Sequence, residues 1–120
     1  MRALVVDDSR TVRLIVGKIL REVGMEVIEA ANGLEALAQL ERSPDVDLML
    51  LDWNMPEMNG LELLSSVRRD NRLATTKIMM VTTETALTEI TRALEAGADE
   101  YIMKPFTLDA VDDKLRILGW

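Results

Sequence analysis

The sequence predicts a single α/β domain in which a doubly wound, five-stranded parallel sheet carries helices on both faces. Five short apolar runs recur along the 120 residues, each too short for a helix and each followed by a segment with helical periodicity. Such alternation of strands and helices is typical of parallel sheets that are covered on both faces. The runs are residues 3–6, 27–30, 48–51, 78–81 and 101–103.

The composition of the runs predicts the order of the strands. The first, third and fourth runs are wholly apolar, as buried central strands should be. Glu29 interrupts the second run, and Glu100 directly precedes Tyr101 in the fifth, so these two strands should form the edges. The expected order is therefore 2-1-3-4-5, the flavodoxin-like (βα)5 arrangement. A Rossmann-type half is the structural alternative, but no glycine-rich fingerprint follows the first run.

The helix expected after the first run has the clearest pattern. Its apolar residues recur at a spacing that places them in one stripe on one face. Ser9 is the expected N-cap, and Gly24 is expected just beyond the last turn. The stripe comprises Val12, Ile15, Val16, Ile19, Leu20 and Val23.

The four remaining helices are bounded by turn and capping residues. These are Gly33 and Pro44 around the second helix, Asn59 and Gly60 at the start of the third, Gly97 at the end of the fourth, and Thr107 before the fifth. The apolar positions are Leu87, Ile90 and Leu94 in the fourth helix, and Val111, Leu115 and Leu118 in the fifth.

The composition excludes several kinds of chemistry and partner. Without cysteine there is neither a disulfide framework nor a thiolate nucleophile, and without histidine this chain carries no phosphohistidine of its own. The net charge of −7 disfavours binding to nucleic acid or anionic lipid. No apolar run approaches the roughly 20 residues of a membrane span. We therefore expect a cytoplasmic protein that binds neither nucleic acid nor a membrane.

Polar residues follow four of the five runs, at the edge of the sheet where ligands bind in this class of fold. The second run ends in Ala31 and should contribute nothing to a site. The polar residues are Asp7 and Asp8 after the first run, Asp52 after the third, Thr82 and Thr83 after the fourth, and Lys104, followed by Pro105, after the fifth.

Three carboxylates at one sheet edge cannot all stay ionised without a counter-charge. Mg²⁺ would resolve the conflict, because it prefers carboxylate oxygens, so Asp7, Asp8 and Asp52 are the expected ligands. Asp52 follows the most apolar run and is the candidate nucleophile for an aspartyl-phosphate. Lys104 would supply a fixed positive charge, and the bond to Pro105 can be cis in a tight turn. Taken alone, Asp7 and Asp8 would be an ordinary loop pair.

In this order and at these intervals, the motifs resemble the response-regulator receiver family, and the CheY-type chemotaxis regulators in particular. The resemblance extends from Leu4 to Leu118. Its motifs are the acidic pair Asp7 and Asp8, the segment Asp52-Trp53-Asn54-Met55-Pro56 with Gly60 after it, Val81-Thr82, and Lys104-Pro105-Phe106.

The resemblance implies a phosphoacceptor that signals by changing shape. A histidine kinase or phosphotransfer protein would donate its phosphoryl group to Asp52. The chain would catalyse its own phosphorylation and dephosphorylation, as a signalling receiver and not as an enzyme. The backbone carbonyl of Asn54 would complete the Mg²⁺ site. Thr82 and Tyr101 would act as the switch residues.

By the same resemblance, an unknown output protein would bind the face formed by the fourth helix, the fifth strand and the fifth helix. The protein would be a monomer or a phosphorylation-dependent dimer. From residue 84 onward eight acidic residues stand against four basic ones, whereas a motor-binding relative should present more lysine. Thr83 also departs from the family, which usually has a smaller residue there, and should restrict access to Asp52.

Three alternatives to a stand-alone receiver domain can be compared with the sequence. A haloacid-dehalogenase-like phosphatase needs a second aspartate two residues after the nucleophile, where this chain has Asn54. A flavin carrier needs a phosphate loop where Asp7 and Asp8 would repel phosphate. A receiver domain cut from a longer regulator with a DNA-binding or other output domain remains the alternative.

Overall fold

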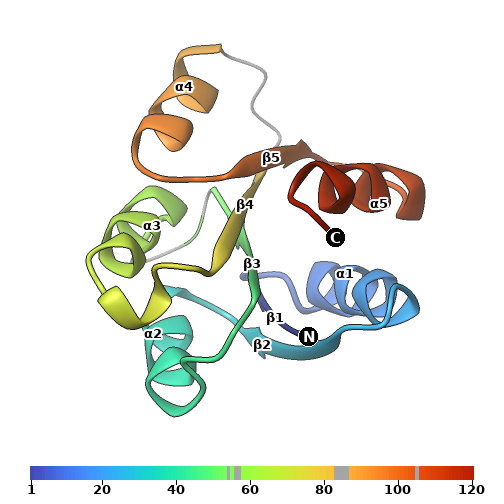
Figure 1. Ribbon diagram of the computed structural model, residues 1–120, viewed down its shortest axis with the longest axis horizontal. Coiled ribbons are helices and arrows are strands. Elements are labelled where there is room, and N and C mark those ends of the chain that lie inside the picture. The colour runs from blue at the N-terminus through green and yellow to red at the C-terminus, as the bar shows by residue number, and fades with distance from the viewer. Residues whose placement is uncertain (54, 56–57, 83–86, 105) are drawn as a thin grey trace.

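The computed structural model describes residues 1–53, 55, 58–82, 87–104 and 106–120, and over these residues it confirms the predicted sheet. Five parallel strands lie in the order β2-β1-β3-β4-β5 (Figure 1). Each strand begins or ends within one residue of its predicted run. The bounds are Arg2–Val6 for β1, Glu26–Ala30 for β2, Leu48–Asp52 for β3, Lys77–Thr82 for β4 and Glu100–Met103 for β5.

Helices cover both faces of the sheet, as Figure 1 shows. The helices α1 (Arg10–Glu22) and α5 (Leu108–Ile117) lie on one face. On the other face lie α2 (Gly33–Arg42), α3 (Gly60–Arg68) and α4 (Leu87–Glu95). A short 3₁₀ helix, η1 (Asn71–Leu73), which was not predicted, connects α3 to β4. Within the described residues, no helix is long and apolar enough to cross a membrane.

The central strand β3 divides the hydrophobic core into two clusters. All five of its residues are buried. Met49 and Leu51 belong to the cluster beneath α2, α3 and α4, whereas Leu48 and Leu50 belong to the cluster beneath α1 and α5. This alternation follows from the two-residue period of a strand. A strand covered on both faces is expected to be apolar, which is why the run 48–51 placed β3 correctly, with Asp52 at the sheet edge.

Capping residues fix the helix ends close to where the sequence predicts them. The side chains of Ser9, Asn59 and Thr107 each accept a hydrogen bond from a backbone amide in the first turn of α1, α3 and α5. Gly24 and Gly97 follow α1 and α4 with φ of 94° and 112°, a conformation that favours glycine.

Two of the predicted apolar helix positions are exposed, among those whose side chains the structure describes. Ile15 is 55% exposed and Leu94 is 43% exposed. Successive helical residues differ by about 100° in direction, so a wide apolar stripe extends past the contact with the sheet. In α1 that contact is made by Val16 and Leu20, and in α4 by Ala93.

Candidate functional site

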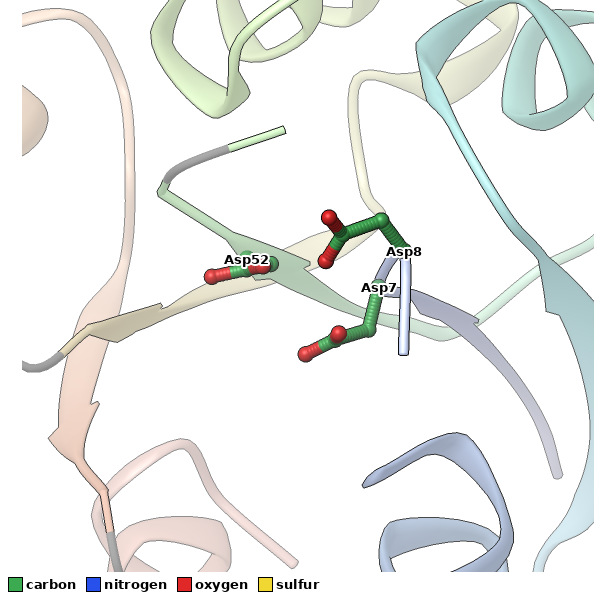
Figure 2. Close-up of side chains that lie close together, drawn as sticks. All are labelled: Asp7, Asp8 and Asp52. Carbon is green, nitrogen blue, oxygen red and sulfur yellow. The ribbon is translucent and has the colours of Figure 1, made fainter. Parts of the chain in front are cut away.

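The carboxyl edge of the sheet brings the three predicted acidic residues together. Because β1 and β3 are neighbours, with Val6 in register with Leu51, the residues that end them lie side by side. Figure 2 shows Asp7, Asp8 and Asp52 grouped at this edge. One carboxylate oxygen from each lies within 4.8 Å of the others. Asp7 and Asp52 are buried, at 3% and 6% exposed, while Asp8 is exposed.

The turn from β1 into α1 holds Asp7 in place. Its Oδ1 accepts a hydrogen bond of 2.9 Å from the backbone amide of Ser9, the residue that caps α1. Its Oδ2 accepts a hydrogen bond of 2.9 Å from Nζ of Lys104. Both oxygens of this carboxylate are therefore fixed by the protein, one from its own turn and one from the far side of the site.

Lys104 follows β5 and reaches back across the sheet edge. Its Nζ lies 2.9 Å from Asp7 and 3.4 Å from Oδ1 of Asp52. Burial lowers the pKa of Lys104, but the hydrogen bond to Asp7 and the charges of Asp52 and Asp7 outweigh burial, so its pKa is raised. The ammonium group is therefore charged at neutral pH and balances part of the negative charge of the site.

The donor set fits a hard divalent cation. One ammonium group stands against three carboxylates, which leaves room for further positive charge. Oxygens on opposite sides of an octahedral Mg²⁺ are about 4.2 Å apart. One carboxylate oxygen from each of the three residues lies within 4.8 Å of the others, which is close to that separation.

The two predicted switch residues, Thr82 and Tyr101, lie on β4 and β5, on the side of Asp52 away from the acidic pair. Thr82 ends β4 and is 4% exposed, and Tyr101 is half-buried in β5. Both line a narrow cavity of about 10 Å³, together with Trp53. On its other side Tyr101 lines an open groove along α5 of about 390 Å³, where Nζ of Lys114 lies 4.6 Å from the ring centroid.

Three predictions fall outside the described residues. These are the backbone carbonyl of Asn54 as a metal ligand, the restriction of access by Thr83, and the turn at Pro105.

A residue inside the second strand supports the site indirectly, a contact that the pattern of residues after each strand did not predict. Glu29 in β2 pairs with Arg13 of α1, and Arg13 in turn donates a hydrogen bond of 2.6 Å to the backbone carbonyl of Asp7. Two features of the sequence hinted at this pair. Glu29 interrupts an apolar run, and a basic residue near the start of a helix opposes the helix dipole.

Comparisons with known proteins agree with the fold. The family model for the response regulator receiver domain matches residues 3–116. The chemotaxis protein CheY1 of Helicobacter pylori is 46% identical over 119 residues, which cover 98% of this chain and 96% of that protein. A CheY homologue of Campylobacter jejuni is 46% identical over 121 residues, covering 99% of this chain and 93% of that protein.

The fold also matches that of a solved structure. The chemotaxis protein CheY4 of Vibrio cholerae superposes with a TM-score of 0.91 at 35% identity, covering 97% of this chain and 96% of that one. Both the sequence and the arrangement of its strands and helices therefore place the chain in one family. It belongs to the receiver domains of two-component response regulators, as a homologue of the CheY proteins.

Proposed function

We propose that Asp52 accepts a phosphoryl group from a phosphohistidine of a partner protein. The observation that carries this proposal is the buried carboxylate of Asp52 beside two further carboxylates, with the ammonium group of Lys104 against it. An oxygen of Asp52 forms the new bond to phosphorus while the bond from phosphorus to the donor's imidazole nitrogen breaks. Water later attacks phosphorus and releases phosphate, which restores the carboxylate.

The surrounding residues would supply positive charge and alignment for both steps. Mg²⁺, held by Asp7, Asp8, Asp52 and the carbonyl of Asn54, would neutralise charge on the phosphoryl oxygens. Lys104 already contacts Asp7 and Asp52 and stays protonated, so it offers a second fixed charge to the same oxygens. The chain thereby promotes its own phosphorylation and dephosphorylation and acts as a regulator.

Thr82 and Tyr101 are proposed to carry the signal to the surface. The cavity that they share is about 10 Å³, roughly the space of one water molecule. The Tyr101 ring would need more room than this to turn inward, and a movement of Thr82 would supply part of it. A phosphoryl group on Asp52 would attract the Thr82 hydroxyl and open that room, which shifts the balance between two arrangements of α4 and β5.

The face formed by α4, β5 and α5 is the proposed contact for an output protein. The similar proteins from Helicobacter pylori and Campylobacter jejuni are named as chemotaxis proteins, and this supports a role in chemotaxis here. The chain spans nearly all of their length, which fits a CheY-type regulator. A histidine kinase or phosphotransfer protein would be the donor.

The phosphoacceptor is tested by labelling with a small acyl phosphate. In the presence of Mg²⁺, intact mass should rise by one phosphoryl group, and chelation during the reaction should prevent the rise. Asp52→Asn should remain unlabelled. Asp45→Asn, a matched change at an exposed aspartate before β3, should label like the wild type. Equal labelling of Asp52→Asn would overturn the assignment.

The switch is tested by amide NMR with beryllofluoride and Mg²⁺ as the phosphate mimic. We expect shifts at Tyr101 and through α4 in the wild type. Thr82→Ala should still accept phosphate but lose these distant shifts, because the hydroxyl that responds to phosphate is gone. If the wild-type shifts stay confined to the surroundings of Asp7, Asp52 and Lys104, the domain binds phosphate without switching.

A further inference from the structure

Arg13 connects the edge strand β2 to the turn that carries the acidic pair. One guanidinium nitrogen, Nη1, donates to the carbonyl oxygen of Asp7 at 2.6 Å, and Nε donates to Glu29 at 3.1 Å. The side chain of Arg13 is only 14% exposed. The guanidinium is therefore held between the turn after β1 and the strand β2. The backbone carbonyl of Glu29 also accepts a hydrogen bond from the Gln39 side chain of α2.

The carbonyl that Arg13 holds belongs to the peptide that joins Asp7 to Asp8. The orientation of that peptide determines where both side chains leave the backbone. The amide of Asp7 also bonds to the carbonyl of Ala30 in β2, at 3.2 Å, so β2 fixes the turn on both sides of Asp7. A shift of this peptide would move both acidic side chains relative to Asp52.

We propose that Arg13, oriented by Glu29, is a positioning residue that sets the affinity of the acidic cluster for Mg²⁺. The inference rests on the proposed metal site and adds residues that do not touch the metal. Partners that orient metal ligands typically contribute about 10- to 100-fold to metal affinity. A planar group with several donors suits this role, because it can bond the peptide and the carboxylate at the same time.

The direction in which Mg²⁺ affinity changes when Arg13 is replaced distinguishes a positioning role from a purely electrostatic one. Arg13 carries a positive charge near a cation site, so removal of that charge alone would make Mg²⁺ bind more tightly. Loss of positioning has the opposite effect, because the carboxylates of Asp7 and Asp8 would no longer be aligned with Asp52. A weaker affinity after removal of a nearby positive charge therefore has no electrostatic explanation.

The experiment is a Mg²⁺ titration followed by Trp53 fluorescence, with every variant made in a Trp120→Phe background. Arg13→Met should weaken Mg²⁺ binding by about tenfold. Arg10→Met, at an exposed arginine in the first turn of the same helix, is the matched charge control and should bind at least as tightly as the parent. Glu29→Gln should weaken binding less, and should add little to Arg13→Met because both act through one contact.

Further variants keep the test decisive. Arg13→Lys retains the charge but offers one nitrogen in place of the two that bond Asp7 and Glu29, so it should lie between the parent and Arg13→Met. If Arg13→Met does not fold, Arg13→Lys and Glu29→Gln decide the question, and affinities equal to the parent in both would overturn the proposal. Binding by Arg13→Met as tight as by Arg10→Met would also overturn it.

Asp8→Ala separates this proposal from the one on which it rests. If Asp8→Ala leaves the titration unchanged, the metal site itself is wrong. If Asp8→Ala abolishes the response while Arg13→Met does not weaken it, the site stands and only the role of Arg13 is wrong. Amide NMR of the metal-free protein gives a second readout, since Arg13→Met should shift and broaden the Asp8 and Ser9 resonances.

Discussion

Among single residues, Lys104 offsets part of the negative charge of the site. It pairs with the buried carboxylates of Asp7 and Asp52, and these partners raise its pKa despite its partial burial. A lysine whose pKa is higher in the folded than in the unfolded protein stabilises the fold wherever it is protonated in both states. That contribution is complete below the unfolded pKa of about 10.4 and is lost as pH rises through the folded pKa.

The first prediction concerns stability at alkaline pH. In metal-free buffer, the free energy of unfolding of the wild type should exceed that of Lys104→Met by a margin that is constant at neutral pH and shrinks above about pH 10. Urea unfolding at a series of pH values measures the margin. Lys18→Met, at an exposed lysine of α1, should show no such change with pH. A margin that stays constant through pH 11 would mean that Lys104 does not stabilise the fold through its charge.

Among the elements, α3 packs directly against the end of β3 through Gly60. The amide of Gly60 donates to the carbonyl of Trp53 at 3.1 Å. A Cβ at Gly60 would overlap the carbonyl oxygen of Asp52 and come within 3.1 Å of Cα of Trp53. Only a residue without a side chain lets the start of α3 pack against the end of β3, directly behind the proposed phosphoacceptor.

The second prediction compares two helical glycines. Gly60→Ala should destabilise the protein by about 1–3 kcal/mol, because rigid backbone atoms must move to admit the methyl group. Gly17→Ala meets the flexible end of Arg21 at 3.3 Å and Val27 at 3.6 Å, so it should be neutral or stabilise α1 by up to about 1 kcal/mol. Urea unfolding measures both. Equal stability of the two variants would show that the backbone at Gly60 yields easily.

For the molecule as a whole, Arg68 joins elements at the edge of the sheet opposite the site. Its guanidinium donates to the carbonyls of Gly97 and Thr76, at 2.8 and 2.9 Å. It also pairs with Asp99 at 2.6 Å, and Asp99 in turn accepts from the amide of Ile78 at 2.8 Å. The end of α3, the turn after α4 and the start of β4 are thus held by one side chain.

The third prediction separates stability from phosphotransfer. Arg68→Met should destabilise the protein by about 2–3 kcal/mol, because carbonyls and a carboxylate lose a charged donor. Arg69→Met, at the exposed neighbouring arginine, should change stability by less than about 0.5 kcal/mol. Both variants, where folded, should label at Asp52 like the wild type, since Arg68 contacts the amino ends of the strands. Labelling lost in folded Arg68→Met would contradict this separation.

The sequence was sufficient for the sheet and for the acidic residues of the site. Periodicity and composition predicted five strands, their order and the caps Ser9, Asn59 and Thr107, because each depends on residues near in sequence or on burial of whole strands. Parallel strands end at a common edge, so the residue that follows each strand is brought to that edge. Asp7 and Asp52 were found in this way.

Tertiary structure alone decided which distant side chains meet. The pairing of Arg13 with Glu29 and of Arg68 with Asp99, and the exposure of Ile15 on an apolar stripe, depend on how helices are rotated against the sheet. Backbone periodicity fixes the face from which a side chain leaves. Which residue a side chain contacts depends on its rotamer and on elements far away in sequence, and no local pattern encodes these.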